Sequence, residues 1–147
     1  MLTLRRLLFL VMLGGTGVLV VAACGDDGSG SSRAGAPGEV VQAYVAAYNA
    51  QDIDGVMALF AEDAVIVEGD ERIEGAEAIR AGEVAKFEVH APGGEAYSIS
   101  NLIVTDNTVT WDHLFKGTAH TCVGTGDEAV VEDGKIVMWT FASFTCD

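Results

Sequence analysis

Between residues 39 and 87, apolar side chains recur in three stretches at the three- and four-residue spacing of an α-helix. The first stretch, Glu39–Ala50, predicts an amphipathic helix, and the second begins after Asp52 or Asp54, either of which can cap it. The third covers about Ala76–Phe87. The side chains expected on the buried faces of the three helices are Val41, Tyr44, Val45 and Tyr48, then Val56, Met57, Leu59 and Phe60, then Ile79 and Val84.

Other segments have the short apolar runs and two-residue alternation of β-strands. The predicted strands are Asp63–Gly69, Glu71–Gly75, Tyr97–Val104, Thr108–Lys116, Thr118–Val123, Asp127–Glu132 and Lys135–Thr145. The sequences TDNT and EDGK fall between strands and are typical of hairpin turns. Helices that come mainly first, followed by an antiparallel sheet, predict an α+β fold.

Strand alternation also predicts which side chains face inward. The expected inward sets are Val109, Trp111, His113 and Phe115, then Asp127, Ala129 and Val131, then Ile66 and Glu68. Three polar residues, Glu68, His113 and Asp127, therefore project from otherwise apolar faces, and Tyr44 of the first helix is expected to join them. A largely apolar cavity with a few convergent polar groups is typical of a small-molecule site, and Trp111, Phe115 and Phe60 are expected to line it with His113.

The first 38 residues predict an extracytoplasmic protein. Met1–Ala23 has a basic start and an apolar run that is too short for a comfortable membrane span, which is typical of a secretory signal peptide. Its ending, VVAAC, resembles the cleavage site of bacterial lipoproteins, so Cys24 is expected to carry lipid and to anchor the mature chain to the cell membrane. Residues 24–38 are rich in Gly, Ser and Asp and predict a flexible tether, which leaves residues 39–147 as one domain.

The formal net charge of −14 disfavours nucleic acid and anionic lipid head groups as partners. A homodimer is left open. If Cys24 carries lipid, Cys122 and Cys146 remain as a pair in an oxidising compartment, and we predict a disulfide between them. A regular hairpin closed by Asp133-Gly134 would place the two cysteines one step out of register. One bulge, expected at the glycines of CVGTGDE, would bring them opposite each other.

Three segments carry a family resemblance: VVQAYVAAYNAQDIDGVMALFAEDA, EGAEAIR and EDGKIVMWTF. Together they resemble the nuclear-transport-factor-2-like superfamily, which includes the SnoaL-like polyketide cyclases and the ketosteroid isomerases. The resemblance implies a cone-shaped, curved antiparallel sheet packed against about three N-terminal helices, and it specifies this fold better than any activity.

The isomerase pattern falls on three residues. Tyr44 matches the tyrosine of the oxyanion hole, Glu68 matches the general base, and Asp127 matches the protonated aspartate of the oxyanion hole. The resemblance thus implies that Glu68 shuttles a proton next to a carbonyl while the other two donate to the enolate oxygen. Each residue also has a structural interpretation: Glu68 as a strand-end acid that is paired with Arg72 or Arg80 or is simply solvated, Tyr44 as a core aromatic, and Asp127 as a turn residue.

His113, His120 and Asp112 lack the compact spacing of metal ligands, and no cofactor fingerprint is present, so neither a metal nor a cofactor is expected. His113 is expected either to line the pocket as a donor or to be a satisfied core histidine. Two classes of function remain. One is a small-molecule enzyme of the isomerase or cyclase type acting on a hydrophobic substrate, and the other is a non-catalytic module of the cell envelope that binds a ligand or a protein.

Overall fold

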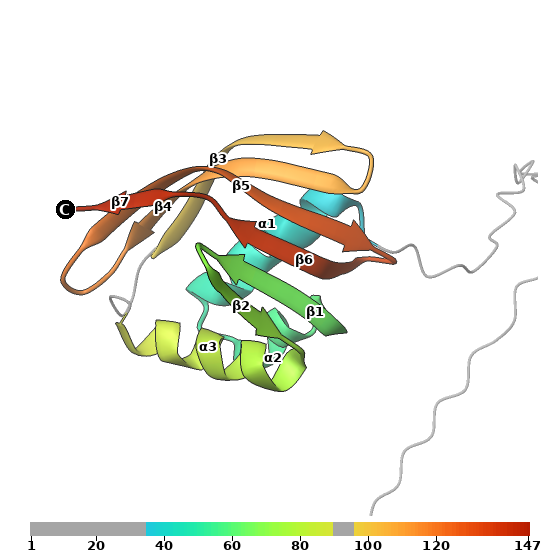
Figure 1. Ribbon diagram of the computed structural model, residues 1–147, viewed down its shortest axis with the longest axis horizontal. Helices are drawn as coiled ribbons and strands as arrows, with labels where there is room; N and C mark the ends of the chain where they lie inside the picture. The colour runs from blue at the N-terminus through green and yellow to red at the C-terminus, as the bar shows by residue number, and fades with distance from the viewer. Residues whose placement is uncertain (1–34, 90–95) are drawn as a thin grey trace, which may run out of the picture. The chain divides into compact units, whose positions relative to one another are not determined.

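The computed structural model describes residues 35–89 and 96–147, so the expected signal peptide, Cys24 and the tether up to residue 34 lie outside the described residues. The elements, in chain order, are α1 (Pro37–Asn49), α2 (Ile53–Met57), β1 (Phe60–Glu68), β2 (Glu71–Glu74), α3 (Ala76–Val89), β3 (Tyr97–Thr105), β4 (Thr108–Lys116), β5 (Thr121–Glu132), β6 (Lys135–Phe141) and β7 (Phe144–Cys146) (Figure 1). None of the described helices is long and apolar enough to cross a membrane.

The strands form one curved sheet in the order β2-β1-β6-β5-β4-β3, with β7 also paired to β5. The predicted α+β class is confirmed. The sheet is mixed, however, because β1 and β6 run parallel while the other pairs are antiparallel. The successive hairpins from β3 to β6 bring β6 back beside β1 with the chain running in the same direction, which the local strand patterns could not reveal.

One-residue bulges interrupt three of the strand pairs, and the β1–β6 pair has a longer irregularity between Phe60 and Val65. These interruptions help to bend the sheet around the helices (Figure 1). In the β4–β5 pair, the extra residue is Gly126, whose φ of +81° suits glycine. The carboxylate of Asp112 accepts the backbone N–H of Gly126 at 3.0 Å and so supports the bulge from the outer side. Directly after it, Asp127 turns into the interior and is fully buried.

Phe60, predicted on the second helix, is instead the first residue of β1, because α2 ends at Met57. Two predicted divisions between strands are also wrong. The segments expected as Thr118–Val123 and Asp127–Glu132 form one strand, β5, because its two glycines bend the strand without ending it. The final strand is instead divided at Ala142–Ser143 into β6 and β7. At this break the backbone N–H of Ala142 donates to the carboxylate of Asp127 at 2.9 Å rather than to a neighbouring strand.

The predicted disulfide between Cys122 and Cys146 is present and joins β5 to β7. The two residues are directly opposite each other, as one bulge would require. The bulge itself was predicted in the wrong place. It lies between Val130 and Val131 of the β5–β6 pair, where Val137 is the extra residue, and not at the glycines.

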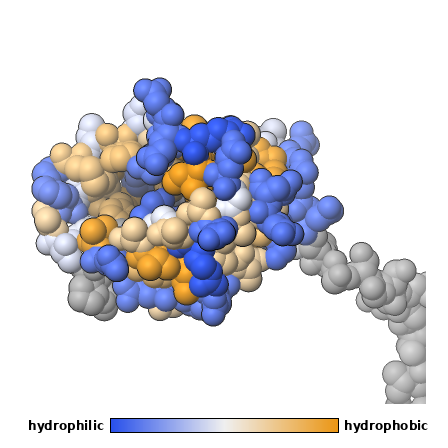
Figure 2. All heavy atoms as spheres, turned by 60° about the horizontal axis from the view of Figure 1, so that its bottom comes forward, coloured by the Kyte–Doolittle hydropathy of each residue, from blue (hydrophilic) through white to orange (hydrophobic). Residues whose placement is uncertain are grey.

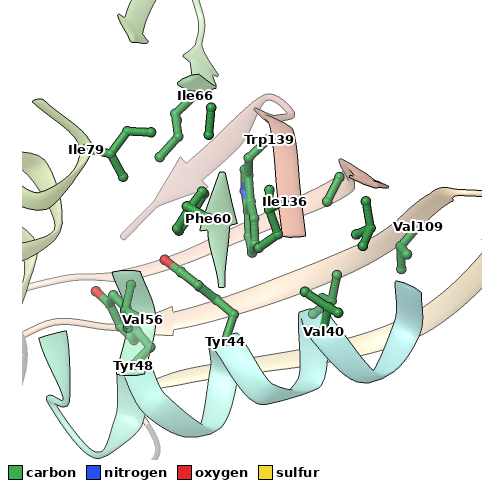
Figure 3. Packing of buried hydrophobic residues seen from close by; sticks show 14 of the residues in the cluster. Val40, Tyr44, Tyr48, Val56, Phe60, Ile66, Ile79, Val109, Ile136 and Trp139 are labelled. Carbon is green, nitrogen blue, oxygen red and sulfur yellow. The ribbon is translucent and has the colours of Figure 1, made fainter. Parts of the chain in front are cut away.

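The core lies between α1 and the inner face of the sheet. Figure 3 shows Val40, Tyr44 and Tyr48 projecting from one side of α1 towards the sheet, with Tyr44 directed at Trp139 of β6. The rings of Tyr44 and Trp139 are 4.4 Å apart between centroids, and Trp111 meets Trp139 edge to face at 4.7 Å. Asn49 fixes the start of β3, because its amide group exchanges two hydrogen bonds with the backbone of Tyr97.

Helix α3 departs from its predicted buried face. Ile79 is 1 % exposed as expected, but Val84 is 41 % exposed, and Glu83 is buried in its place with 1 % exposure. Ile79 and Glu83 are four residues apart and so share one side of the helix, whereas Val84 is rotated away from it. The prediction chose Val84 because it considered only the hydrophobicity of the side chains.

Candidate functional site

A cavity of about 200 Å³ opens between the helices and the inner face of the sheet. Its wall is mostly aromatic and carries one acidic and two basic side chains, which are Glu68, Lys86 and His113. Figure 2 shows a hollow on this side of the domain that is bordered by hydrophobic residues. The lining residues are Tyr44, Tyr48, Glu68, Lys86, Val89, Tyr97, His113, Phe115, Cys122, Phe141 and Phe144.

A histidine–aspartate pair lies at one side of the cavity. Nδ1 of His113 is 2.5 Å from Oδ2 of Asp127, and the two side chains are 5 % and 0 % exposed. Asp127 also accepts the N–H of Ala142 on its other oxygen. An acceptor-only carboxylate in this position holds the imidazole with the proton on Nδ1. Nε2 is then the ring nitrogen available to a ligand in the cavity.

Two further side chains complete the surroundings of Asp127. The indole N–H of Trp111 donates to the Tyr97 hydroxyl oxygen at 3.3 Å, and that hydroxyl donates to Asp127 in a long contact of 3.5 Å. The ring of Tyr97 also stacks on His113, with centroids 5.8 Å apart. Burial raises the pKa of Tyr97 far above its usual value, and the Asp127 charge acts in the same direction, so this hydroxyl remains a donor.

Gly124 makes room for the histidine. It lies directly opposite His113 in the β4–β5 pair, and a Cβ atom added there would be 2.3 Å from Cε1 of the imidazole. No larger residue could occupy this position without moving the ring. The two glycines of GTGDE thus have separate roles. Gly124 leaves space for the ring of His113, and the bulge at Gly126 turns Asp127 towards the interior.

A second buried polar group lies on the opposite, helical side. The hydroxyl of Tyr44 donates to Oε2 of Glu83 at 2.9 Å, and Nζ of Lys86 is 3.3 Å from Oε1 of the same carboxylate. Burial, followed by the charge of Glu83, raises the pKa of Tyr44 well above its usual value. Neither Glu83 nor Lys86 was predicted from the sequence as a site residue. The signal for Glu83 was its position one helical turn after the buried Ile79.

Glu68 ends β1 on the wall of the cavity, directly opposite Phe141 in the β1–β6 pair. Within the described residues its carboxylate makes no hydrogen bond and no ion pair. The two arginines considered as its partners are engaged elsewhere, because Arg72 pairs with Glu74 and Arg80 pairs with Asp54.

The other predicted site residues divide into two groups. Phe115 lines the cavity together with Tyr44, Glu68 and His113. Trp111 and Phe60 are buried in the core and do not belong to the cavity wall. Asp127 is neither on the wall nor in a turn, because it lies inside the sheet behind His113.

Within residues 35–89 and 96–147, no group of three or more potential ligands is arranged to hold a metal ion. Asp112 faces away from His113 and is bonded to Asn101 and to the bulge at Gly126. Nδ1 of His120 is 2.8 Å from the carbonyl of Asp147 near the chain end.

The arrangement combines an apolar chamber with a proton-accepting nitrogen. An imidazole whose tautomer is fixed by a buried carboxylate can take a proton from a bound molecule and return it nearby. The hydroxyl of Tyr44 is less available as a donor to a ligand, because it already donates its proton to Glu83 in a hydrogen bond.

The model of the SnoaL-like domain family matches residues 41–142. Three crystal structures share the fold. A candidate ketosteroid isomerase from Kribbella flavida DSM 17836 has 17% identity, a TM-score of 0.61, and coverage of 72% of this chain and 76% of its own. A candidate polyketide cyclase from Sinorhizobium meliloti has 22% identity, a TM-score of 0.58, and coverage of 70% and 93%.

The third structure is a protein with a ketosteroid isomerase-like fold from Catenulispora acidiphila DSM 44928, in complex with trimethylamine. It has 16% identity and a TM-score of 0.59, and the match covers 71% of this chain and 85% of that one. The family match spans more than half of the chain and coincides with the observed helices and curved sheet. This chain therefore belongs to the SnoaL-like domain family.

Proposed function

We propose that the aromatic cavity binds a small hydrophobic molecule and that His113, oriented by Asp127, transfers a proton to or from it. The observation that carries this proposal is the 2.5 Å contact between the two buried side chains, one of which lines the cavity. A histidine held in this way is a common general acid or base. The family membership and a structural neighbour crystallised with trimethylamine support a small-molecule ligand.

The cavity volume limits the size of the ligand. Pockets for drug-sized molecules span roughly 300–1,000 Å³, whereas this cavity has about 200 Å³. A molecule with one or two small rings suits the chamber, and a steroid would have to extend out through its mouth. We therefore place small ketones ahead of steroids as substrates for an isomerase-type reaction.

The reaction can be tested with cyclohex-3-enone and a Δ5-3-ketosteroid, because migration of the double bond into conjugation changes the ultraviolet absorbance. We expect the full chain to convert the smaller ketone and the His113→Gln variant to lose about 100-fold or more of the rate, the usual contribution of a general acid or base. His120→Gln is the matched control, since it makes the same change at an exposed histidine. Conversion no faster than the uncatalysed background would overturn the proposal.

Glu68 offers a second route for the same proton transfer, as the family resemblance implies. Its carboxylate, which has no partner within residues 35–89 and 96–147, lies on the cavity wall and can act as a base. A Glu68→Gln variant measured beside His113→Gln assigns the role. The group whose loss stops turnover is the base.

A non-catalytic binding module is the other candidate, and one observation favours it. Neither Tyr44 nor Asp127 presents a free proton to the cavity, because the first donates to Glu83 and the second accepts from its neighbours. The two donors of an isomerase oxyanion hole are therefore engaged in internal bonds. Saturable binding of small ketones without any turnover would support this function.

We also propose that Cys24 carries lipid and holds the domain outside the cell membrane, because the apolar run ends in VVAAC. A lipid anchor with two or three acyl chains would hold the protein firmly to the membrane, whereas a single myristoyl chain binds only weakly. Replacing Cys24 with Ala is expected to move the protein from the membrane fraction to the soluble fraction. Mass spectrometry that found the mature N-terminus at another residue would contradict the anchor.

A further inference from the structure

We infer that the natural ligand of this cavity carries an ammonium group on its small apolar body, so that the neutral ketones of the proposed function are partial analogues of it. The inference rests on the proposed function, since it takes the aromatic cavity as the ligand site. It is carried by two features of the wall, which are its aromatic rings and its balance of charge.

The rings provide faces that attract cations. Five aromatic side chains in addition to Tyr44 line the cavity: Tyr48, Tyr97, Phe115, Phe141 and Phe144. The face of an aromatic ring is negative, and groups of such rings bind quaternary and protonated amines. One ring already has such a partner, because Nζ of Lys86 lies 4.5 Å from the centroid of Phe141. The wall therefore accommodates an ammonium ion.

The charges on the wall do not cancel. The charge of Lys86 is balanced by Glu83 at 3.3 Å. Glu68, next to Phe141 on the neighbouring strand, has no partner among the described residues. The remaining acid of the region, Asp127, lies behind His113. A carboxylate that has no counter-ion among the described residues thus faces the same space as the rings. The formal net charge of −14 adds to the attraction for cations.

An anionic ligand fits the same wall poorly. It would have to bind Lys86, and the ammonium would have to leave Glu83 to meet it. Glu83 is 1 % exposed and would then keep only the hydroxyl of Tyr44 as a partner. A buried carboxylate that loses its counter-ion is strongly disfavoured. Lys86 is better described as the cation that satisfies Glu83 than as a binding group for anions.

The inference can be tested with three probes that share a phenyl ring and differ in charge. These are phenyltrimethylammonium, its neutral isostere tert-butylbenzene, and benzenesulfonate. Dissociation constants are measured for the full chain at neutral pH and low ionic strength by calorimetry and by chemical-shift changes of His113. We expect the cation to bind at least about tenfold more tightly than the neutral isostere, and the anion to bind most weakly.

Two variants identify the source of the preference. Glu68→Gln is expected to reduce the cation preference to about threefold or less, the part that the rings alone supply. Glu128→Gln removes the same charge from β5 at a position that alternation places on the opposite face of the sheet from Asp127, and it should leave the preference unchanged.

The outcomes separate this inference from the proposed function. If the neutral probe binds as tightly as the cation, or the anion binds best, the inference is overturned while the cavity remains a ligand site. If none of the three probes binds but cyclohexanone does, the inference is overturned alone, and if cyclohexanone also fails to bind, the proposed function is overturned with it. An equal loss of preference in Glu68→Gln and Glu128→Gln would also overturn it, because the protein's overall charge would then explain the effect.

Discussion

Each ionisable residue inside the domain has a role that depends on its immediate neighbours. Asp127 receives three donors and fixes His113, while Glu83 receives Tyr44 and Lys86. Glu68 is the acid of this group that has no such partner within the described residues. Two of the carboxylates are therefore engaged in the interior, and the third is free to meet a ligand.

The first prediction at the residue scale concerns Tyr44. Replacing it with Phe removes the donor to a buried carboxylate, and the free energy of unfolding should fall by about 1–3 kcal/mol. Urea denaturation of Tyr44→Phe, Glu83→Gln and the double variant measures how strongly the two side chains are coupled. Strictly additive effects would show that the 2.9 Å hydrogen bond has no energetic importance.

Gly124 gives a second prediction. Ala at this position places Cβ against the ring of His113, so Gly124→Ala should lower the free energy of unfolding by about 1–3 kcal/mol and slow any turnover. Gly82→Ala is the control, because in α3 the nearest atom to an added Cβ is 3.9 Å away. That substitution should stabilise the fold by about 0.5–1 kcal/mol. Equal effects of the two substitutions would contradict the close approach of His113 to Gly124.

At the scale of elements, the strand patterns predicted much of the site. Two-residue alternation correctly assigned His113 to the inner face of β4 and Asp127 to the inner face of β5. It could not predict that the two side chains meet, because their contact depends on the bulge at Gly126 and on the space above Gly124. Alternation gives the face of a sheet to which a residue belongs, but not the distance between residues on neighbouring strands.

For helix α3, the extent of the element was predicted but one of its buried side chains was not. Its length and position were predicted closely, but the inward side chain at its centre was not, because a glutamate is normally assigned to solvent. Glu83 is buried because Tyr44, far away in sequence, supplies a donor. A long-range partner of this kind leaves no trace in the local pattern. The parallel pairing of β1 with β6 was missed for the same reason.

The short strand β7 supports a prediction about the disulfide. Cys146→Ser frees the end of the chain, which carries Phe144 of the cavity wall. A loop of this length predicts a loss of roughly 3 kcal/mol in the free energy of unfolding. Thermal or urea unfolding of the variant gives this value, and peptide mapping locates the bond. Free thiols at both Cys122 and Cys146 in the native protein would contradict the pairing.

At the scale of the whole molecule, the buried tyrosines predict how stability responds to alkali. The pKa values of Tyr44 and Tyr97 are raised in the folded state above the ordinary value of 10.0. Below that pH both are protonated in the folded and the unfolded chain, so their contribution is complete. Above it the unfolded chain loses protons that the folded chain retains, and the free energy of unfolding falls as the pH rises.

Urea denaturation across the alkaline range should therefore show a steepening loss of stability above about pH 10. In the Tyr44→Phe variant the loss should be less steep, since one of the two groups is gone. Tyrosinate absorbance provides the check. Were both tyrosines to titrate near pH 10 in a protein that remains folded, their burial would be contradicted.

The central claim is that His113, held by Asp127, presents Nε2 to a ligand in the aromatic cavity. Long-range 1H–15N correlation NMR of the imidazole tests it most directly, with His113→Gln identifying the signal. We predict the Nδ1–H tautomer in the full chain, its loss in Asp127→Asn, and a shift of the Nε2 resonance when cyclohexanone is added. A proton on Nε2 in the native protein, or a His113 signal that does not respond to the ketone, would contradict the account.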